Sequence, residues 1–161
     1  MIWTFIAAML AGASLVMLFI PRLPASAAAY ASLWALQLSP WGSLSDGTMI
    51  FWSVATAVDL ASFALQDSAL RRATPGVAFM RGGAIVGAFV GMAMNSMATV
   101  IVSAAAGAVF GFLAFSRTRG AVPLMNMPVR RRAEYFAAKT IGAVIAVSMV
   151  CLTLSSLIVT A

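Results

Sequence analysis

Long apolar stretches dominate the chain, and short polar or proline-containing segments separate them. The stretches run well past the roughly 4–8 residues of a buried strand and show no strict alternation of polar and apolar positions, so each predicts a helix. The expected elements, all within one domain of residues 1–161, are Ile2–Ile20, Ala25–Leu38, Thr48–Gln66 with Thr48 as a possible N-cap, a longer run Gly83–Phe115, and about Glu134–Val159.

The run from Gly83 to Phe115 is too long for one span. As a single helix it would measure roughly 50 Å at 1.5 Å per residue, whereas the hydrocarbon core of a bilayer is roughly 30 Å thick. Asn95-Ser96 lies near its middle, and these side chains compete with helical hydrogen bonds. We therefore expect a glycine-rich re-entrant helical hairpin with arms Gly83–Met94 and Met97–Phe115.

Composition places these helices in a membrane. The chain is 63% hydrophobic and only 9% charged, whereas a soluble domain carries about 25% charged residues. We expect an all-α integral membrane protein with about three to four spanning helices plus the hairpin. Ala25-Ser26-Ala27 resembles a signal-peptide cleavage site, but the preceding segment has no basic residue at its start, so a retained helix is expected.

Basic residues predict the orientation. The chain has ten Lys and Arg against four Asp and Glu, and the basic residues lie outside the apolar runs or near their ends. If the hairpin enters and leaves on one side, the basic loop before it, with Arg71, Arg72 and Arg81, and the basic loop after it, which begins with Arg117 and Arg119, face the same compartment. The positive-inside rule makes that side cytoplasmic and puts both termini outside. Arg130, Arg131 and Arg132 would then form a cytoplasmic anchor with affinity for anionic lipid.

Small residues repeat every four positions in both arms of the expected hairpin. One stripe is Gly83, Gly87 and Gly91, and the other is Ser103, Gly107 and Gly111. Such stripes let helix backbones approach closely in lipid. They could pack the two arms together, or they could pair the chain with another copy or with another membrane protein.

Asp59 is the only acidic residue inside an expected membrane segment. A lone carboxylate in hydrocarbon costs at least a few kcal/mol, so Asp59 should face protein or water. It is either a proton- or cation-coupled site or a hydrogen-bonded strut. Lys139 lies one turn inside the last helix, where it could pair with Asp59 or, as we expect, snorkel to the cytoplasmic surface.

The order of the segments allows an inverted repeat. Ile2–Leu38 followed by Thr48–Gln66 would mirror Gly83–Phe115 followed by Glu134–Val159. If the first pair were also re-entrant, Arg22 would meet Asn95 and Ser96 near the midplane, where helix ends could hold an ion. In the preferred topology Arg22 is instead a residue of an interfacial turn.

Catalysis has little support in the sequence. There is no histidine, Cys151 is the only cysteine, and no helix carries a pair of carboxylates, so no enzyme, metal or cofactor is expected. The positive charge is assigned to topology and not to nucleic acid. Three function classes remain. The first is a small homo-oligomeric transporter or channel-like protein for an ion or small solute, and the second is an accessory or scaffolding subunit that packs through its glycine-zipper helices. The third and weakest is lipid handling.

Several of these features occur together in one known order. They are Pro21-Arg22-Leu23-Pro24, Ala57-Val58-Asp59-Leu60, the Gly83–Gly91 stripe, Gly107-Ala108-Val109-Phe110-Gly111, and Gly142 in the last helix. In this the chain resembles the bacterial membrane proteins grouped as the domain of unknown function 456 family, which carry glycine-zipper motifs. The resemblance implies a multi-pass protein of the bacterial inner membrane and implies no activity.

Overall fold

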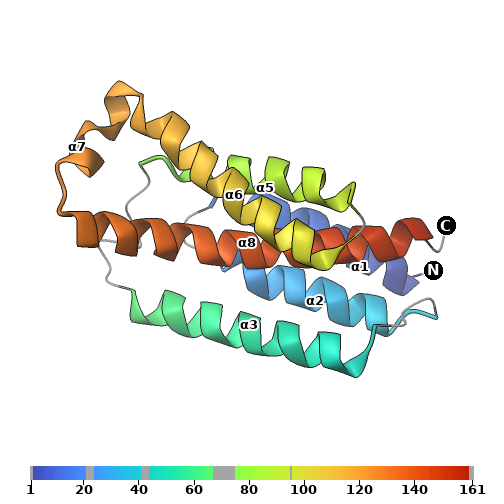
Figure 1. Ribbon diagram of the computed structural model, residues 1–161. Coiled ribbons are helices and arrows are strands. Elements are labelled where there is room, and N and C mark those ends of the chain that lie inside the picture. The colour runs from blue at the N-terminus through green and yellow to red at the C-terminus, as the bar shows by residue number, and fades with distance from the viewer. Residues whose placement is uncertain (1, 21–23, 41–43, 67–74, 95, 160–161) are drawn as a thin grey trace.

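The helices predicted from the apolar stretches account for nearly all regular structure in the computed structural model, which describes residues 2–20, 24–40, 44–66, 75–94 and 96–159. Within those ranges the chain forms helices and no strand. The elements are α1 (Ile2–Met17), α2 (Ala25–Gln37), α3 (Asp46–Leu65), α5 (Val77–Met92), α6 (Met97–Ser116), η1 (Arg119–Ala121), α7 (Val122–Met125) and α8 (Val129–Val159). Successive long helices run in opposite directions, so the start of α1 and the end of α8 lie at the same end of the bundle (Figure 1).

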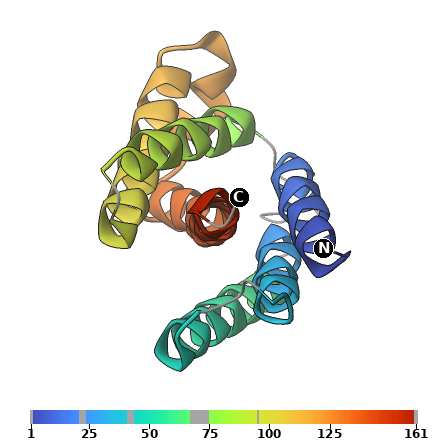
Figure 2. The same cartoon turned by 90° about the vertical axis from the view of Figure 1, so that its right-hand side faces the viewer.

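Helix α8 is the centre of the bundle. It packs against α1, α2, α5 and α6 and, more sparsely, against α3 (Figure 2). The closest pairs along the chain are α1 with α2 and α5 with α6. Helix α3 lies at the edge, on α2 and α8. The two halves therefore share an order of helices, but their long helices α3 and α8 do not occupy equivalent positions.

Three helices are long and apolar enough to cross a membrane, namely α3, α6 and the segment Val129–Ile158 of α8. The first helix is shorter than its sequence suggested. It has 16 residues and ends at Met17, so it is roughly 24 Å long, and α5 has the same length. These features are compatible with a membrane protein.

The long fourth run is divided into two helices at the expected place. Helix α5 ends at Met92 and α6 begins at Met97, after Ser96 in an extended conformation. The start of the first arm was predicted too late, because α5 begins at Val77 and not at Gly83. Gly76, with φ +73°, sets that boundary in a left-handed conformation that suits glycine.

Both glycine stripes are used inside the chain. An ideal Cβ on Gly83 would collide with the backbone oxygen of Gly107, and one on Gly87 would collide with that of Ser103. A Cβ on Gly91 would meet the Ser103 side chain, and one on Gly111 would meet the backbone of α5. Of the two interpretations left open by the sequence, packing of α5 on α6 is the one observed.

Two other helix starts differ from the prediction. Helix α3 begins at Asp46, because Ser45 is the N-cap and accepts a hydrogen bond from the Thr48 amide at 3.3 Å. Helix α8 begins at Val129, directly after Pro128, so the arginine run lies in its first turn and not in a loop. The rest of the expected basic loop contains the short helices η1 and α7.

Small side chains and side chains with a hydroxyl group make many of the contacts between helices. Fully buried alanines such as Ala11, Ala29, Ala88 and Ala146 allow close packing around α8. Hydrogen bonds also link neighbouring helices. The Ser14 hydroxyl of α1 donates to the Ala25 carbonyl of α2 at 3.0 Å, and Tyr30 of α2 bonds Ser53 of α3 at 2.5 Å. Helix α8 is bonded to α2 through Thr153 and Ser32 at 3.1 Å, and to α3 through Met149 Sδ and the Thr56 hydroxyl at 3.8 Å.

Charge is distributed unequally between the two ends. The basic residues that the structure describes lie toward one end, where α1, α3 and α6 finish and α2, α5 and α8 begin (Figure 1). They are Arg81, Arg117, Arg119, Arg130, Arg131, Arg132 and Lys139. Arg22, Arg71 and Arg72 lie outside the described residues. We call this the basic end; among the described residues, the opposite end carries only the charge of Asp46.

Candidate functional site

A small polar cavity lies inside the bundle near the basic end, and we call it the Asp59 cavity. Its volume is about 30 Å³, enough to hold a water molecule. It lies where the end of α1 and the start of α2 meet α3, α5 and α8. The lining residues are Leu18, Pro24, Ala25, Asp59, Phe63, Gln66, Arg81, Ala138, Lys139, Gly142 and Ala143.

The Asp59 side chain extends from α3 into the cavity, where it contacts both α2 and α8. The Ser26 hydroxyl, in the first turn of α2, donates a hydrogen bond to Asp59 Oδ2 at 2.5 Å. On the other side the carboxylate lies against α8 at Gly142, where an added Cβ would come within 2.5 Å of Oδ1. The glycine in α8 is therefore what leaves room for the carboxylate.

Arg81 reaches the cavity from α5. Its Nη1 donates to the carbonyl oxygen of Leu18, just past the end of α1, and its Nε donates to the carbonyl of Lys139 in α8 at 3.5 Å. The guanidinium therefore joins three helices through backbone oxygens. It also lies near enough to Asp59 for their opposite charges to attract.

The start of α2 and the end of α1 stabilise the charges of Asp59 and Arg81, respectively. A helix N-terminus carries partial positive charge and a C-terminus partial negative charge. The first turn of α2 faces the Asp59 carboxylate through Ser26, and the last carbonyls of α1 face the Arg81 guanidinium through Leu18. The end of α1 and the start of α2 thus bring both kinds of helix end to one cavity and stabilise a negative and a positive charge there.

Lys139 is buried in the bundle, so the expectation that it snorkels to the surface is wrong. Only 2% of the residue is exposed. It lies one turn after Tyr135, and its ammonium lies 5.9 Å from the centre of that ring. Both residues are on the face of α8 that is turned toward the core, so the side chain points into the Asp59 cavity. Tyr135 in turn donates a hydrogen bond to the Pro75 carbonyl at 2.7 Å.

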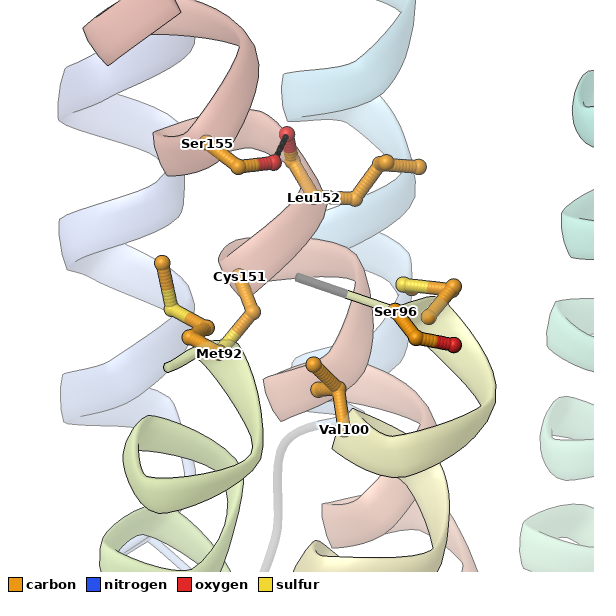
Figure 3. A pocket seen from close by; sticks show the side chains of 7 residues that line it. Met92, Ser96, Val100, Cys151, Leu152 and Ser155 are labelled. Carbon is orange, nitrogen blue, oxygen red and sulfur yellow. Dashed lines mark hydrogen bonds between the residues drawn. The ribbon is translucent and has the colours of Figure 1, made fainter. Parts of the chain in front are cut away.

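The other predicted site residues are not brought to this cavity. Asn95 and Arg22 lie outside the described residues. Ser96 lies at the end opposite the basic end, between α5 and α6, and lines a separate pocket of about 190 Å³ (Figure 3). Cys151 and Ser155 of α8 line the same pocket, and the Ser155 hydroxyl is turned back to the Leu152 carbonyl at 2.9 Å. The Asp59 and Ser96 sites are therefore separate.

The sequence prediction missed Arg81, Ser26, Gln66 and Gly142 as members of the site. Gln66 ends α3 and donates from Nε2 to the Ala138 carbonyl at 3.4 Å, which ties α3 to α8 beside the cavity. Arg81 had been assigned to a loop, although an apolar segment begins at Val77, four residues before it. That early apolar start was the available signal that Arg81 lies in a helix.

The groups around the cavity suit protons, water or a small ion. They are one carboxylate, two basic side chains and an amide, and the Ser26 hydroxyl is hydrogen-bonded to the carboxylate. In the part of the chain that the structure describes, no three acidic or cysteine side chains come together as a metal-binding group.

Comparison of the chain with models of protein families, with curated proteins and with solved structures finds no match.

Proposed function

We propose that this protein is a multi-pass membrane protein that acts as a small transporter or channel-like protein for an ion or small solute. The observation that carries the proposal is the Asp59 cavity. Asp59, Arg81 and Lys139 come from three different helices and line one space that can hold a water molecule. Ionisable groups are costly inside a membrane and are typical of ion and proton pathways. A strut between two helices needs a single polar pair, not three ionisable groups around a cavity.

Protonation of Asp59 is the step that we propose for coupling. The ionised carboxylate accepts the Ser26 hydrogen bond and attracts Arg81 across the cavity. A proton or cation that neutralises it removes this attraction. Helix α3 lies at the edge of the bundle and is held at the basic end by Asp59 and Gln66, so it is the element that neutralisation frees to move.

The orientation that we propose puts the basic end in the cytoplasm, as the positive-inside rule favours. In this orientation both termini face the outside, and the α5–α6 pair enters and leaves from the cytoplasmic side. Its re-entrant character is supported by the short α5 and by the turn between α5 and α6, which stops short of the end of α8 in Figure 1. A place in the bacterial inner membrane and in the domain of unknown function 456 family is part of the same proposal.

Ion flux through liposomes tests the function. The purified chain is reconstituted, a potential is imposed, and proton and chloride movements are followed with internal dyes. We expect Asp59→Asn to abolish the flux. Asp46→Asn is the matched control, because Asp46 is on the same helix but exposed at its other end. Equal flux through wild type and Asp59→Asn would remove Asp59 from the mechanism.

A second candidate function is an accessory subunit of a larger membrane complex. It is favoured by the outer face of α3, where Ile50, Phe51, Val54 and Val58 are exposed at the edge of the bundle. The glycine stripes are already occupied within the chain, so a partner would bind through another face such as this one. Purification in mild detergent separates the two functions: a stoichiometric second protein supports the subunit, and a homogeneous homo-oligomer supports the transporter.

A further inference from the structure

A second, larger hollow lies on the outside of the bundle between α6 and the first turns of α8. Its volume is about 340 Å³, within the usual range of small-molecule sites. Its lining residues, which share none with the Asp59 cavity, are Val109, Phe112, Val129, Arg132, Ala133 and Phe136. We call it the Arg132 groove. Arg132 is its only polar side chain, and the Phe112 and Phe136 rings pack edge to face with centroids 5.2 Å apart.

Arg132 is incompletely satisfied in the groove. Its Nε is buried and has no hydrogen-bond partner, and its Nη1 contacts only the Met125 sulfur at 3.5 Å. A thioether is a weak acceptor, and a buried guanidinium N–H without an oxygen partner costs free energy. Phosphate and carboxylate oxygens match the fork of an arginine, so the groove lacks an anionic oxygen acceptor at this position.

The surroundings of the groove also favour an anion. Arg132 lies in the first turn of α8, where the helix end carries partial positive charge. Arg117, Arg119 and Arg131 are exposed at the same end. The acidic residue described nearby, Glu134, is already paired with Arg130 at 3.0 Å. Anionic lipid headgroups of the cytoplasmic leaflet are attracted to such clusters by about 1 kcal/mol per basic residue.

We propose that the Arg132 groove binds an anionic phospholipid, with one acyl chain along the apolar wall and the phosphate at the Arg132 guanidinium. The apolar lining accounts for the chain, and the Arg132 guanidinium, to which no oxygen of the described residues is hydrogen-bonded, accounts for the phosphate. A free phosphate ion would leave the aromatic wall uncovered, and an uncharged lipid chain would leave Arg132 unsatisfied. The proposal requires that the chain lies in a membrane, and it does not depend on transport.

Lipid retention in detergent tests the proposal. The purified chain is titrated with phosphatidylglycerol or phosphatidylcholine, and bound lipid is counted by native mass spectrometry. We expect wild type to hold phosphatidylglycerol in preference to phosphatidylcholine. Arg132→Gln should lower that affinity about tenfold, as loss of a charged hydrogen bond predicts. Arg131→Gln is the matched control, because it removes the same charge from an adjacent residue that does not line the groove, and it should lower the affinity clearly less than Arg132→Gln does.

A second variant tests whether lipid binding depends on the groove itself or only on the positive charge around it. Ala133→Phe keeps every arginine and fills the groove, so it should also lower phosphatidylglycerol binding; it carries the test if Arg132→Gln does not fold. Three results would overturn the proposal: equal losses in Arg132→Gln and Arg131→Gln, equal retention of the two lipids, or unchanged binding in Ala133→Phe. Displacement of the lipid by inorganic phosphate alone would assign the site to free phosphate and also overturn it.

Discussion

The carboxylate of Asp59 in α3 rests on the backbone of α8 at Gly142, the position where an added Cβ would stand 2.5 Å from Oδ1. The same carboxylate is bound on its other side by the Ser26 hydroxyl at 2.5 Å. It is therefore enclosed between two helices and cannot shift far without losing one of these contacts. The glycine and the aspartate work as a pair.

Gly142→Ala should disturb this pair. The new methyl group pushes the carboxylate off α8, weakens its bond to Ser26 and leaves a charge poorly paired inside the bundle. We expect a loss of about 1–3 kcal/mol in the free energy of unfolding, measured by thermal or denaturant melting in detergent. Gly12→Ala is the control, since nothing lies within 4 Å of its Cβ position. Similar melting of both variants would contradict the contact.

Two adjacent glycines of α5 should respond in opposite ways to alanine. A Cβ on Gly83 collides with the backbone of α6 at Gly107, whereas a Cβ on Gly82 meets nothing within 4 Å. Gly83→Ala should force the helices apart and lower the melting temperature. Gly82→Ala should raise it slightly, because alanine favours a helix by up to about 1 kcal/mol over glycine. If both variants melt alike, α5 and α6 do not pack through this stripe.

Arg81→Lys should not preserve the function of Arg81 as a link between helices. A guanidinium reaches the Leu18 and Lys139 carbonyls with separate N–H groups, and a lysine ammonium does not reproduce that planar fork. We expect a loss of about 1–3 kcal/mol of stability in detergent melting. Arg117→Lys, an exposed arginine at the same end, should melt like wild type. An unchanged melt for Arg81→Lys would rule out this link.

Thiol labelling tests the orientation and the burial of Lys139 together. In a Cys151→Ala background, single cysteines replace Arg131, Asp46 or Lys139, and vesicles of known sidedness are treated with a membrane-impermeant reagent. Arg131→Cys should react from the cytoplasmic side and Asp46→Cys from the other side, because both positions are exposed at opposite ends. Lys139→Cys should stay unreacted. Ready labelling at position 139 would restore the snorkelling interpretation.

The existence and approximate position of the long helices could be predicted from the sequence because length and hydropathy decide them, whereas the starts of α3, α5 and α8 could not. The division of the fourth run followed from comparing its length with a bilayer, and the structure breaks it between Met92 and Met97. Asp59 stood out because it was the one acid in an apolar segment. These are local properties, and neighbouring helices do not change them.

Contacts between residues of different helices could not be predicted from the sequence in the same way. Arg81 looked like a loop residue because charge normally marks the end of an apolar helix, and its compensating acceptor at Leu18 is remote in the chain. Lys139 looked able to reach the surface because its depth along α8 was known, but the face it occupies was not. The choice of α8 as the central helix depends on packing of all the others, which no single segment encodes.

The helix that the others surround is also the last of the described helices in chain order. Until α8 is in place, the Arg81 guanidinium lacks its Lys139 acceptor and the Asp59 carboxylate lacks the Gly142 backbone behind it. The α1–α2 and α5–α6 pairs can each assemble from their own contacts, but they touch one another mainly through α8. Placement of α8 therefore joins the two helix pairs and completes the polar site in the same step.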